Sequence, residues 1–336
     1  MSTPPATGSW SGRLRSASAA AADAALGARK RRARVASRVA RLPFPLRAPT
    51  WPGSVERPPP DRGLGVDYDT GWSRRYPVRL ARAVLLDNVA RPLARLVADP
   101  VVRGEENLVD LEAPVIFVAN HASHVDTPLL LSCLPVRFRH RTVVAAAADY
   151  FFDRTWKAAL WSFALATIPI ERTRVNRRSA ALAAELVGEG WSLVIFPEGG
   201  RSPDGWGQPF RGGAAYLADR TGRPVVPVHI DGSRHVLPKS GSPGRSGLHR
   251  SQVTVTFGAP LSPDDGEDAR HFGGRIEAAV ATLADERGTD WWTAKRRAAA
   301  GTTPALGGPD VAPWRRAWAL PATPHPAHDD EWPLAD

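Results

Sequence analysis

The sequence predicts an α/β fold, in which helices flank a central sheet, with a helical element before the sheet and flexible termini. Two observations support this fold. Short runs of apolar, β-favouring residues are bounded by Pro, Gly or polar residues, which is typical of buried strands. Stretches with helical spacing of apolar residues lie between these runs, and such alternation indicates an α/β sheet with functional residues at the strand ends.

The predicted elements follow one another from residue 114 onward. Strands are expected at residues 114–119, 142–147, 192–196, 224–230 and 252–257. Helices are expected at residues 128–134, 151–166, 178–188, 212–218 and 264–286. At 336 residues, the chain is long enough to bury a large hydrophobic core.

The first 70 residues form a basic tail. Residues 1–50 contain ten Arg and Lys residues and one acidic residue, so they carry +9 of the net charge of +10. Their Ala-, Ser- and Pro-rich sequence has no periodic apolar face, which predicts disorder for residues 1–62. Alternative interpretations of the tail are a nucleic-acid-binding arm, a transit-type leader and a wrongly assigned start codon. We favour contact with an anionic membrane surface and expect no nucleic acid partner.

Residues 71–100 form an amphipathic helical element. Between Tyr76 and Val97, apolar residues recur at helical spacing beside a basic flank, and Pro92 is expected to kink the helix. One interpretation is an interfacial helix that brings the domain to a bilayer, and the other is a helix packed on the domain with a solvated basic face.

No apolar run reaches the length of a transmembrane helix. The longest candidate, residues 158–170, has the length of a core or interfacial helix, so we expect peripheral membrane contact without a membrane span. The sequence also has no secretory apolar region, and the expected location is the cytoplasmic face of a membrane. The single cysteine, Cys133, lies in an apolar helix and is expected to be a buried, inert thiol.

A polar stretch follows the first predicted strand, from Asn120 to Pro128, with the sequence NHASHVDTP. Thr127 and Pro128 have the residue types of an N-cap and a first helical position. His121 and Asp126 are five residues apart, roughly 140° around a helix, so only a turn before the helix would bring them together. An imidazole oriented by a carboxylate is suited to taking a proton from a hydroxyl group.

Further motifs make the stretch specific. The strand at residues 192–196 runs into FPEGGRS, which ends at Ser202. Together, NHASHVDTP and FPEGGRS resemble the first and third signatures of the glycerolipid acyltransferase family, NHxSxxD and FPEGTRS, with Gly200 in place of the usual Thr. Residues 166–172 approximate the second signature, GxIFIxR, with Ala and Pro in place of Gly and the aromatic residue. Residues 226–228 resemble the fourth, and the similarity covers about residues 102–260.

The resemblance implies a mixed central sheet within an acyltransferase domain at residues 101–288. It implies that His121 is the catalytic base and Asp126 orients it. Arg172 and Arg201 would bind the acceptor phosphate. Glu198 would hold an Arg in place or bind a hydroxyl group of the acceptor, and the family implicates it in acceptor binding. Gly199 and Ser202 of the third motif complete the expected substrate-binding set.

The implied reaction transfers an acyl group from acyl-CoA or acyl carrier protein to a hydroxyl group of a phosphorylated glycerolipid in phospholipid biosynthesis. The expected acceptor is 1-acyl-sn-glycerol-3-phosphate, and glycerol 3-phosphate or another lipid precursor is the alternative. No cofactor and no metal are expected. Residues 158–170 would line an acyl-chain tunnel or simply form core.

Two other classes compete with this interpretation. In a metal-dependent hydrolase, His121, His124 and Asp126 would be ligands, although their spacing departs from H-x-H-x-D-H by one residue. In a non-catalytic membrane- or nucleic-acid-binding protein, the basic tail would carry the function. A serine hydrolase is not expected, because the sequence has no G-x-S-x-G elbow.

Residues 289–336 form a Trp- and Pro-rich C-terminal tail in which Arg pairs lie among the tryptophans. Amphipathic aromatic residues of this kind suit a membrane interface. They suit equally a strap docked on the enzyme, and the sequence does not separate the two.

Overall fold

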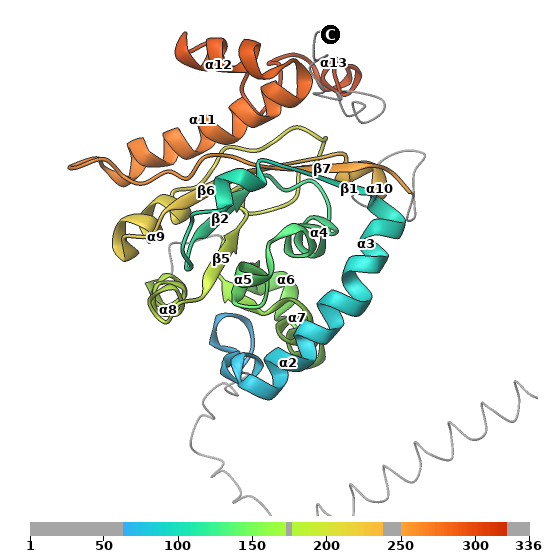
Figure 1. Cartoon of the computed structure of the whole chain (residues 1–336), viewed down its shortest axis with the longest axis vertical. Helices are drawn as coiled ribbons and strands as arrows, with labels where there is room; N and C mark the ends of the chain where they lie inside the picture. Colours follow the sequence, from blue (N-terminus) through green and yellow to red (C-terminus); the bar gives the residue numbers. More distant parts are fainter. Residues whose placement is uncertain (1–62, 173–176, 238–249, 321–336) are drawn as a thin grey trace, which may run out of the picture. The chain divides into compact units, whose positions relative to one another are not determined.

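A seven-stranded mixed sheet organises the fold, with the strand order β1-β7-β6-β2-β5-β3-β4 (Figure 1). The computed structural model describes residues 63–172, 177–237 and 250–320, so the expectation of disorder for residues 1–62 lies outside the described residues. The strands are β1 (Pro100–Arg103), β2 (Ile116–Ala119), β3 (Thr142–Ala147), β4 (Thr167–Ile170), β5 (Ser192–Ile195), β6 (Val225–Asp231) and β7 (Val253–Phe257). All five expected strands are present, and β1 and β4 are additional.

Strands β6, β2, β5, β3 and β4 are parallel to one another, whereas β7 runs antiparallel to β6 and β1 runs parallel to β7. The mixed sheet implied by the sequence resemblance is therefore confirmed. The additional strands β1 and β4 are the two edges of the sheet.

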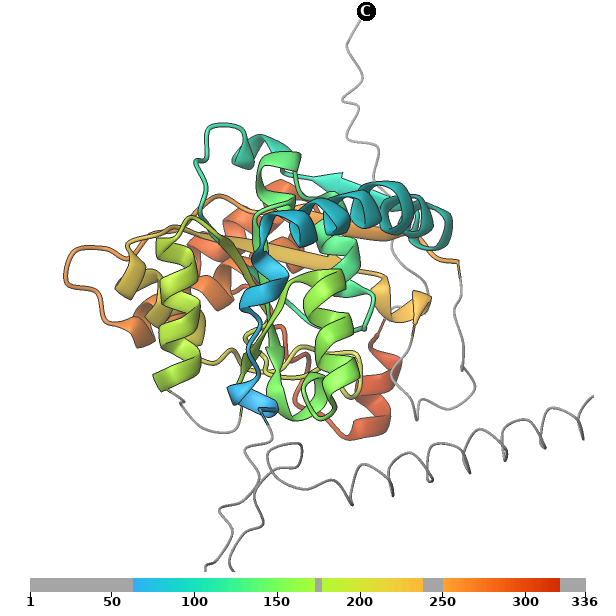
Figure 2. The same ribbon diagram turned by 90° about the horizontal axis from the view of Figure 1, so that it is seen from below.

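Two layers of helices cover the sheet, as Figures 1 and 2 show. The longer helices are α2 (Tyr76–Leu85), α3 (Arg91–Ala98), α4 (Asp126–Cys133), α7 (Thr155–Leu165), α8 (Arg177–Gly188), α9 (Gly213–Thr221), α11 (Ala269–Gly288), α12 (Trp291–Ala299) and α13 (Pro313–Trp318). Short helices are α5 (Val136–Arg139), α6 (Ala148–Phe151) and α10 (Ser233–Val236), and short 3-10 turns are η1 (Gly65–Asp67), η2 (Gly71–Arg74) and η4 (Glu105–Leu108).

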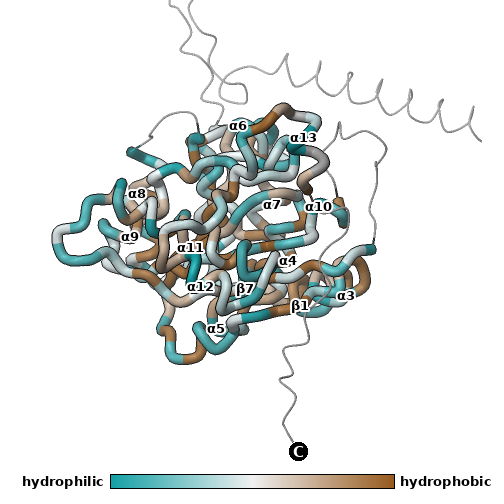
Figure 3. The backbone as a smooth tube through the Cα atoms, turned by 90° about the horizontal axis from the view of Figure 1, so that it is seen from above, coloured by the Kyte–Doolittle hydropathy of each residue, from teal (hydrophilic) through white to brown (hydrophobic). Residues whose placement is uncertain are grey.

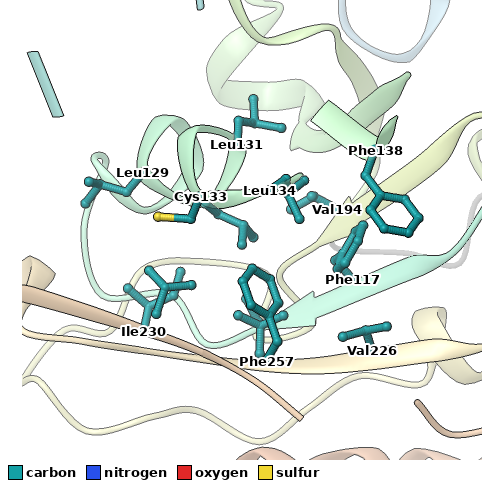
Figure 4. Packing of buried hydrophobic residues seen from close by; sticks show 14 of the residues in the cluster. Phe117, Leu129, Leu131, Cys133, Leu134, Phe138, Val194, Val226, Ile230 and Phe257 are labelled. Atoms are coloured by element: carbon teal, nitrogen blue, oxygen red, sulfur yellow. The ribbon is translucent and has the colours of Figure 1, made fainter. Parts of the chain in front are cut away.

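The central strand β2 separates the two layers, because successive side chains of a strand point to opposite faces. Phe117 and Ala119 face a core formed with α3, α4 and α5, whereas Ile116 and Val118 face a core formed with α8, α9 and α11. In the first core, the ring of Phe117 packs edge-on against Phe138 at 5.5 Å between centroids (Figure 4). Cys133 belongs to the same core, and burial raises the pKa of its thiol to about 12.

The predicted amphipathic helix is one continuous helical path over residues 76–98, interrupted by the π-helical turn η3 (Leu86–Ala90). The N–H of Arg91 donates to the carbonyl oxygen of Leu86, five residues earlier. Pro92 has no N–H and its ring crowds the preceding turn, so a wider turn is needed directly before it. The disturbance predicted at Pro92 therefore takes the form of a π turn.

One face of this path is packed and the other is exposed. Leu86 and Ala98 are buried against the domain. The exposed stripe consists of Tyr76, Leu80, Val84, Val89, Leu93 and Leu96, each more than half exposed. Brown, apolar segments along α3 mark part of it in Figure 3. In the described part of the chain, no helix combines the length and the apolar character needed to cross a membrane.

Arg82 fastens α2 to α7. Its guanidinium is buried and donates to the carbonyl oxygens of Ser73 at 3.0 Å and of Ser162 and Phe163 at 3.4 Å. The last two carbonyls lie in the final turn of α7, where helix carbonyls lack intrahelical partners and attract a cation. Burial, together with the nearby charges of Arg79 and Arg74, lowers the pKa of Arg82 to about 10. The side chain therefore remains charged at neutral pH.

Replacing Arg82 with Ala should lower the free energy of unfolding by about 1–3 kcal/mol, because buried carbonyl groups lose their donor. Urea denaturation measures the change. The control is Arg75→Ala, which removes an exposed guanidinium at the start of the same helix and should stay within about 0.5 kcal/mol of the wild type. Equal stability of the two variants would show that Arg82 does not fasten the helix.

Candidate active site

The candidate site lies where β2 and β5 end. The chain leaves β2 for α4, on one face of the sheet, and leaves β5 for α9, on the other face. Adjacent parallel strands with connections to opposite faces form a crevice at their carboxyl ends, which is the usual ligand site of open α/β sheets. The first sequence motif follows β2 and the third follows β5, so the topology brings both to this crevice.

Asp126 and His121 are in contact. Oδ2 of Asp126 lies 2.8 Å from Nδ1 of His121, and it also accepts the N–H groups of Ala122 and Ser123 at 2.8 Å each. The predicted turn between strand and helix is therefore present. The helix α4 begins at Asp126 with Val125 before it, so the N-cap predicted at Thr127 and the helix start at Pro128 are wrong. The turn stabilised by the Asp126 carboxylate runs directly into the helix.

The contact decides which nitrogen of His121 can react. An ionised carboxylate only accepts hydrogen bonds, so Nδ1 of the neutral imidazole carries the proton and Nε2 is left as the basic nitrogen. Asp126 is fully buried and the side chain of His121 is 15% exposed. The ring of His121 stacks on Phe196, at 4.2 Å between centroids and 25° between planes. The imidazole is therefore fixed in tautomer and in orientation.

Glu198 joins the two motifs through the backbone. Oε1 of its buried carboxylate accepts the N–H of His121 at 2.7 Å, and Oε2 accepts the N–H of Gln208 at 3.0 Å. Burial raises the pKa of Glu198 to about 7, against the effect of these two N–H groups, which favour the ionised form. The predicted role of Glu198 in acceptor binding stays a prediction, and its contacts in the structure are with the backbone.

Arg172 reaches the third motif from the end of β4. Its Nη1 lies 3.4 Å from the carbonyl oxygen of Gly199, while Nη2 and Nε donate to Oδ2 of Asp149 at 2.6 and 3.2 Å. The Arg172–Asp149 pair is partly exposed, and such pairs are weak. Ala166, where the family has Gly, adopts a left-handed conformation with φ of 52° at the end of α7. The backbone expected for Gly is thus retained.

Arg211 is a further cation at this place. Its side chain donates to the carbonyl oxygen of Arg172 and lies against the α-carbon of Gly199, where an added Cβ would be 2.9 Å from Cζ. Gly199 has φ of +74°, so both its backbone and its missing side chain are needed here. Gly200 is less restricted, because a Cβ there would meet only Nη1 of Arg172 at 3.6 Å.

Ser202 and Arg201 complete the third motif. The N–H of Ser202 donates to the carbonyl oxygen of His121 at 2.8 Å, and its buried hydroxyl accepts the N–H of Gly205 at 2.7 Å. Ser202 thus forms the turn beside His121, and substrate contact by its hydroxyl stays a prediction. Arg201 is close enough to His124 to act on its titration.

An aromatic wall borders the site, formed by His124, Tyr150, Phe151 and Trp161. His124 stacks on Tyr150 at 5.6 Å between centroids, and Phe151 packs edge-on against Trp161 at 5.7 Å. Burial and the positive charges of Arg201 and His121 lower the pKa of His124 to about 4. His124 is therefore neutral at physiological pH and adds an uncharged ring to the aromatic wall.

The structure brings His121 and Asp126 together as predicted, and it places Arg172, Glu198 and Gly199 around the same turn. Three neighbours were missed by sequence reasoning, namely Asp149, Tyr150 and Arg211. Asp149 and Tyr150 lie shortly after the carboxyl end of a predicted strand, which was a signal in the sequence, and Arg211 lies between the third motif and the next predicted helix. Among the described residues, no group of three or more His, Cys, Asp or Glu side chains is placed to hold a metal ion.

Part of the chain is similar to known proteins. Residues 99–231 match a family model described as Acyltransferase. The chloroplastic 1-acyl-sn-glycerol-3-phosphate acyltransferase BAT2 of Brassica napus is 32% identical over 163 residues, which cover 48% of this chain and 44% of that protein. The chloroplastic 1-acyl-sn-glycerol-3-phosphate acyltransferase LPAT1 of Arabidopsis thaliana is 30% identical over 167 residues, which cover 48% and 43%.

The chain thus spans less than half the length of these curated relatives. The crystal structure of the 1-acyl-sn-glycerophosphate (LPA) acyltransferase PlsC from Thermotoga maritima aligns with a TM-score of 0.49 and 25% identity, over 65% of this chain and 83% of that chain. The match at residues 99–231, which is less than half of the chain, agrees with the family resemblance of the sequence motifs.

The raised pKa of Glu198 gives a prediction for stability. The folded protein holds the proton of Glu198 up to about pH 7, whereas the unfolded chain releases it near 4.5. The stabilisation is therefore complete below about pH 4.5 and is lost as the pH rises to about 7. Relative to Glu198→Gln, which does not titrate, the wild type should lose about 3 kcal/mol of unfolding free energy across this window, at ~1.4 kcal/mol per pKa unit.

Urea denaturation of both proteins at several pH values measures this difference. The comparison with Glu198→Gln cancels the titration of all other groups, since the two proteins share them. A difference in unfolding free energy that stays constant between pH 4.5 and 7 would contradict the assignment of the raised pKa to Glu198.

Proposed function

We propose that this protein is an O-acyltransferase that moves a fatty acyl group from a thioester to a hydroxyl group of a phosphorylated glycerolipid, 1-acyl-sn-glycerol-3-phosphate. The observation that carries the proposal is the 2.8 Å contact between Nδ1 of His121 and Oδ2 of Asp126, which leaves Nε2 as a base beside the crevice. The names of the curated relatives support the acceptor. The thioester donor, acyl-CoA or acyl carrier protein, follows from the family resemblance.

In the proposed mechanism, Nε2 of His121 takes the proton from the acceptor hydroxyl as its oxygen attacks the thioester carbonyl carbon. Asp126 stabilises the imidazolium that forms. The C–S bond of the tetrahedral intermediate then breaks, and the departing thiolate takes the proton from His121. The products are an ester and a free thiol, and the imidazole returns to its starting tautomer.

The acceptor phosphate would lie beside Arg172 and Arg201, with Arg211 behind them. Guanidinium groups are suited to phosphate because their planar donors bind two oxygens at once. The exposed Asp149 carboxylate is a weak partner for Arg172, so a phosphate dianion would replace it. The aromatic wall would lie against the hydrocarbon part of a substrate.

The test measures thiol release from a long-chain acyl-CoA with lysophosphatidate, glycerol 3-phosphate or no acceptor. The wild type should release thiol only with an acceptor, with lysophosphatidate ahead, and EDTA should have no effect. His121→Ala should lose at least about 10²-fold in rate, the lower range for general-base assistance. His140→Ala, which changes a histidine away from the crevice, is the control.

Thiol release that needs no acceptor and disappears with EDTA would favour the metal-dependent hydrolase class instead. Acceptor-dependent release that persists in His121→Ala would remove His121 as the base. If acyl carrier protein donors and other acceptors also gave no release, the enzyme proposal would fall.

The protein should also bind anionic membranes peripherally through the exposed stripe on α2, η3 and α3. The six apolar side chains of this stripe lie beside Arg75 and Arg95, both exposed, which would pair with anionic headgroups. The basic run Arg29 to Arg41, which lies outside the described residues, would add to the same attraction. The cytoplasmic face of a membrane remains the proposed location.

The wild type should co-sediment with vesicles of phosphatidylglycerol and phosphatidylcholine. The double variant Leu80→Asp/Leu93→Asp should bind these vesicles at least about tenfold more weakly, because it places charge in the apolar layer of the membrane. The matched control is Val109→Asp, which changes an exposed valine directly after η4 and should bind as the wild type does. Equal binding of all three proteins would show that the stripe does not face the membrane.

A further inference from the structure

The C-terminal segment that follows α12 contacts the loop that follows the third motif. We infer that residues 302–320, here called the strap, position the loop Ser202–Gln208 and thereby set the affinity for the acceptor. This inference rests on the proposed acyltransferase function. The strap lies outside residues 99–231, which match the family model, so it is a feature of this chain beyond the matched domain.

An ion pair holds the strap to the loop. Nε and Nη2 of Arg316 donate to Oδ2 of Asp204 at 3.0 and 2.9 Å, and Nη1 donates to the carbonyl oxygen of Pro309 at 2.9 Å. The Arg316 side chain is 24% exposed, so the pair is partly shielded from water. One guanidinium group, that of Arg316, thus bonds both within the strap, to Pro309, and to the loop, at Asp204.

Trp206 supplies a second attachment. Its indole N–H donates to the carbonyl oxygen of Arg316 at 3.0 Å, and the N–H of Gly207 donates to the carbonyl oxygen of Leu306 at 2.9 Å. The indole ring lies directly on Gly308, where an added Cβ would come within 2.2 Å of the ring. The loop is therefore clamped on its outer side by backbone, ring and charge contacts.

The same loop is also hydrogen-bonded to the backbone of His121 and to Glu198. Gly205 donates its N–H to Oγ of Ser202, whose own N–H donates to the carbonyl oxygen of His121. At the other end of the loop, the N–H of Gln208 holds Glu198, and Nε2 of Gln208 lies 3.3 Å from the carbonyl oxygen of Arg201. The loop thus connects the strap to the backbone of the candidate phosphate-binding residue.

Because of this connection, loss of the strap should weaken acceptor binding and leave the chemical step nearly unchanged. Release of the strap would loosen the loop and the backbone of Arg201, which the acceptor phosphate would contact. The His121–Asp126 contact is formed within residues 121–126. The loop reaches His121 at its backbone, through Ser202 and, by way of Gln208, through Glu198. Arg316 is therefore a positioning residue whose loss should raise KM for the acceptor and leave kcat nearly unchanged.

The experiment compares Arg316→Ala with Arg315→Ala in the full chain. The side chain of Arg315 is exposed and stacks on Trp314 at 4.9 Å, so Arg315→Ala is a control of the same type and place. For Arg316→Ala, KM for lysophosphatidate should rise about 5- to 10-fold with kcat within about twofold of wild type, the scale of one lost charge-assisted contact. Arg315→Ala should match the wild type.

Charge reversal adds a rescue test. Asp204→Arg and Arg316→Asp should each raise KM, and the double variant should recover part of the loss because the pair is restored with opposite polarity. A lower melting temperature with unchanged KM in Arg316→Ala would show a merely structural role and overturn the inference. So would equal KM values for Arg316→Ala and Arg315→Ala.

A measurement that does not depend on enzymatic activity tests the inference independently of the proposed function. Amide hydrogen exchange should be faster at Gly205, Gly207 and Gln208 in Arg316→Ala than in the wild type or in Arg315→Ala. If the wild type transfers no acyl group but this difference appears, the proposed function fails while the coupling of strap and loop stands. Unchanged exchange at all three amides would overturn the coupling itself.

Discussion

One carboxylate oxygen holds together the turn that carries His121. Oδ2 of Asp126 accepts the imidazole N–H of His121 and the backbone N–H groups of Ala122 and Ser123. The same contact shapes the turn after β2, selects the start of α4 and fixes the tautomer of His121. Oδ1 of Asp126 is buried without a hydrogen-bond partner among the described residues, so Oδ2 alone provides this support. A buried carboxylate with such a set of donors has few alternative positions.

The order of strands in the sheet brings the other site residues to this turn. Because β2 and β5 are neighbours with connections to opposite faces, the third motif lies beside the first. Glu198 and Ser202 then bond to the N–H and carbonyl groups of His121, so the backbone of the histidine is held from both sides. Packing of Phe196 against the imidazole adds a stacking contact. The tautomer of the ring therefore depends on Asp126, and the position of the His121 backbone depends on the third motif.

The sequence predicted the elements whose signal is local. The strand at residues 142–147 has the predicted bounds, and the His121–Asp126 turn followed from spacing and chemistry. The strand β4 was missed because its four residues include Pro169 and directly follow an apolar helix. The contact of Arg211 with Arg172 and the docking of the C-terminal segment on Trp206 depend on partners far away in sequence. Local patterns carry no information about such partners, which tertiary packing selects.

The proposed chemistry depends on Asp126, which keeps the proton of His121 on Nδ1 and leaves Nε2 as the base. Nitrogen-15 NMR of labelled histidine measures the tautomer of each imidazole directly, with His121→Gln identifying the signal. At a pH where the ring is neutral, we expect a protonated Nδ1 and an unprotonated Nε2 for His121, and a loss of this preference in Asp126→Ala. A proton on Nε2 in the wild type, or an unchanged tautomer in Asp126→Ala, would contradict it.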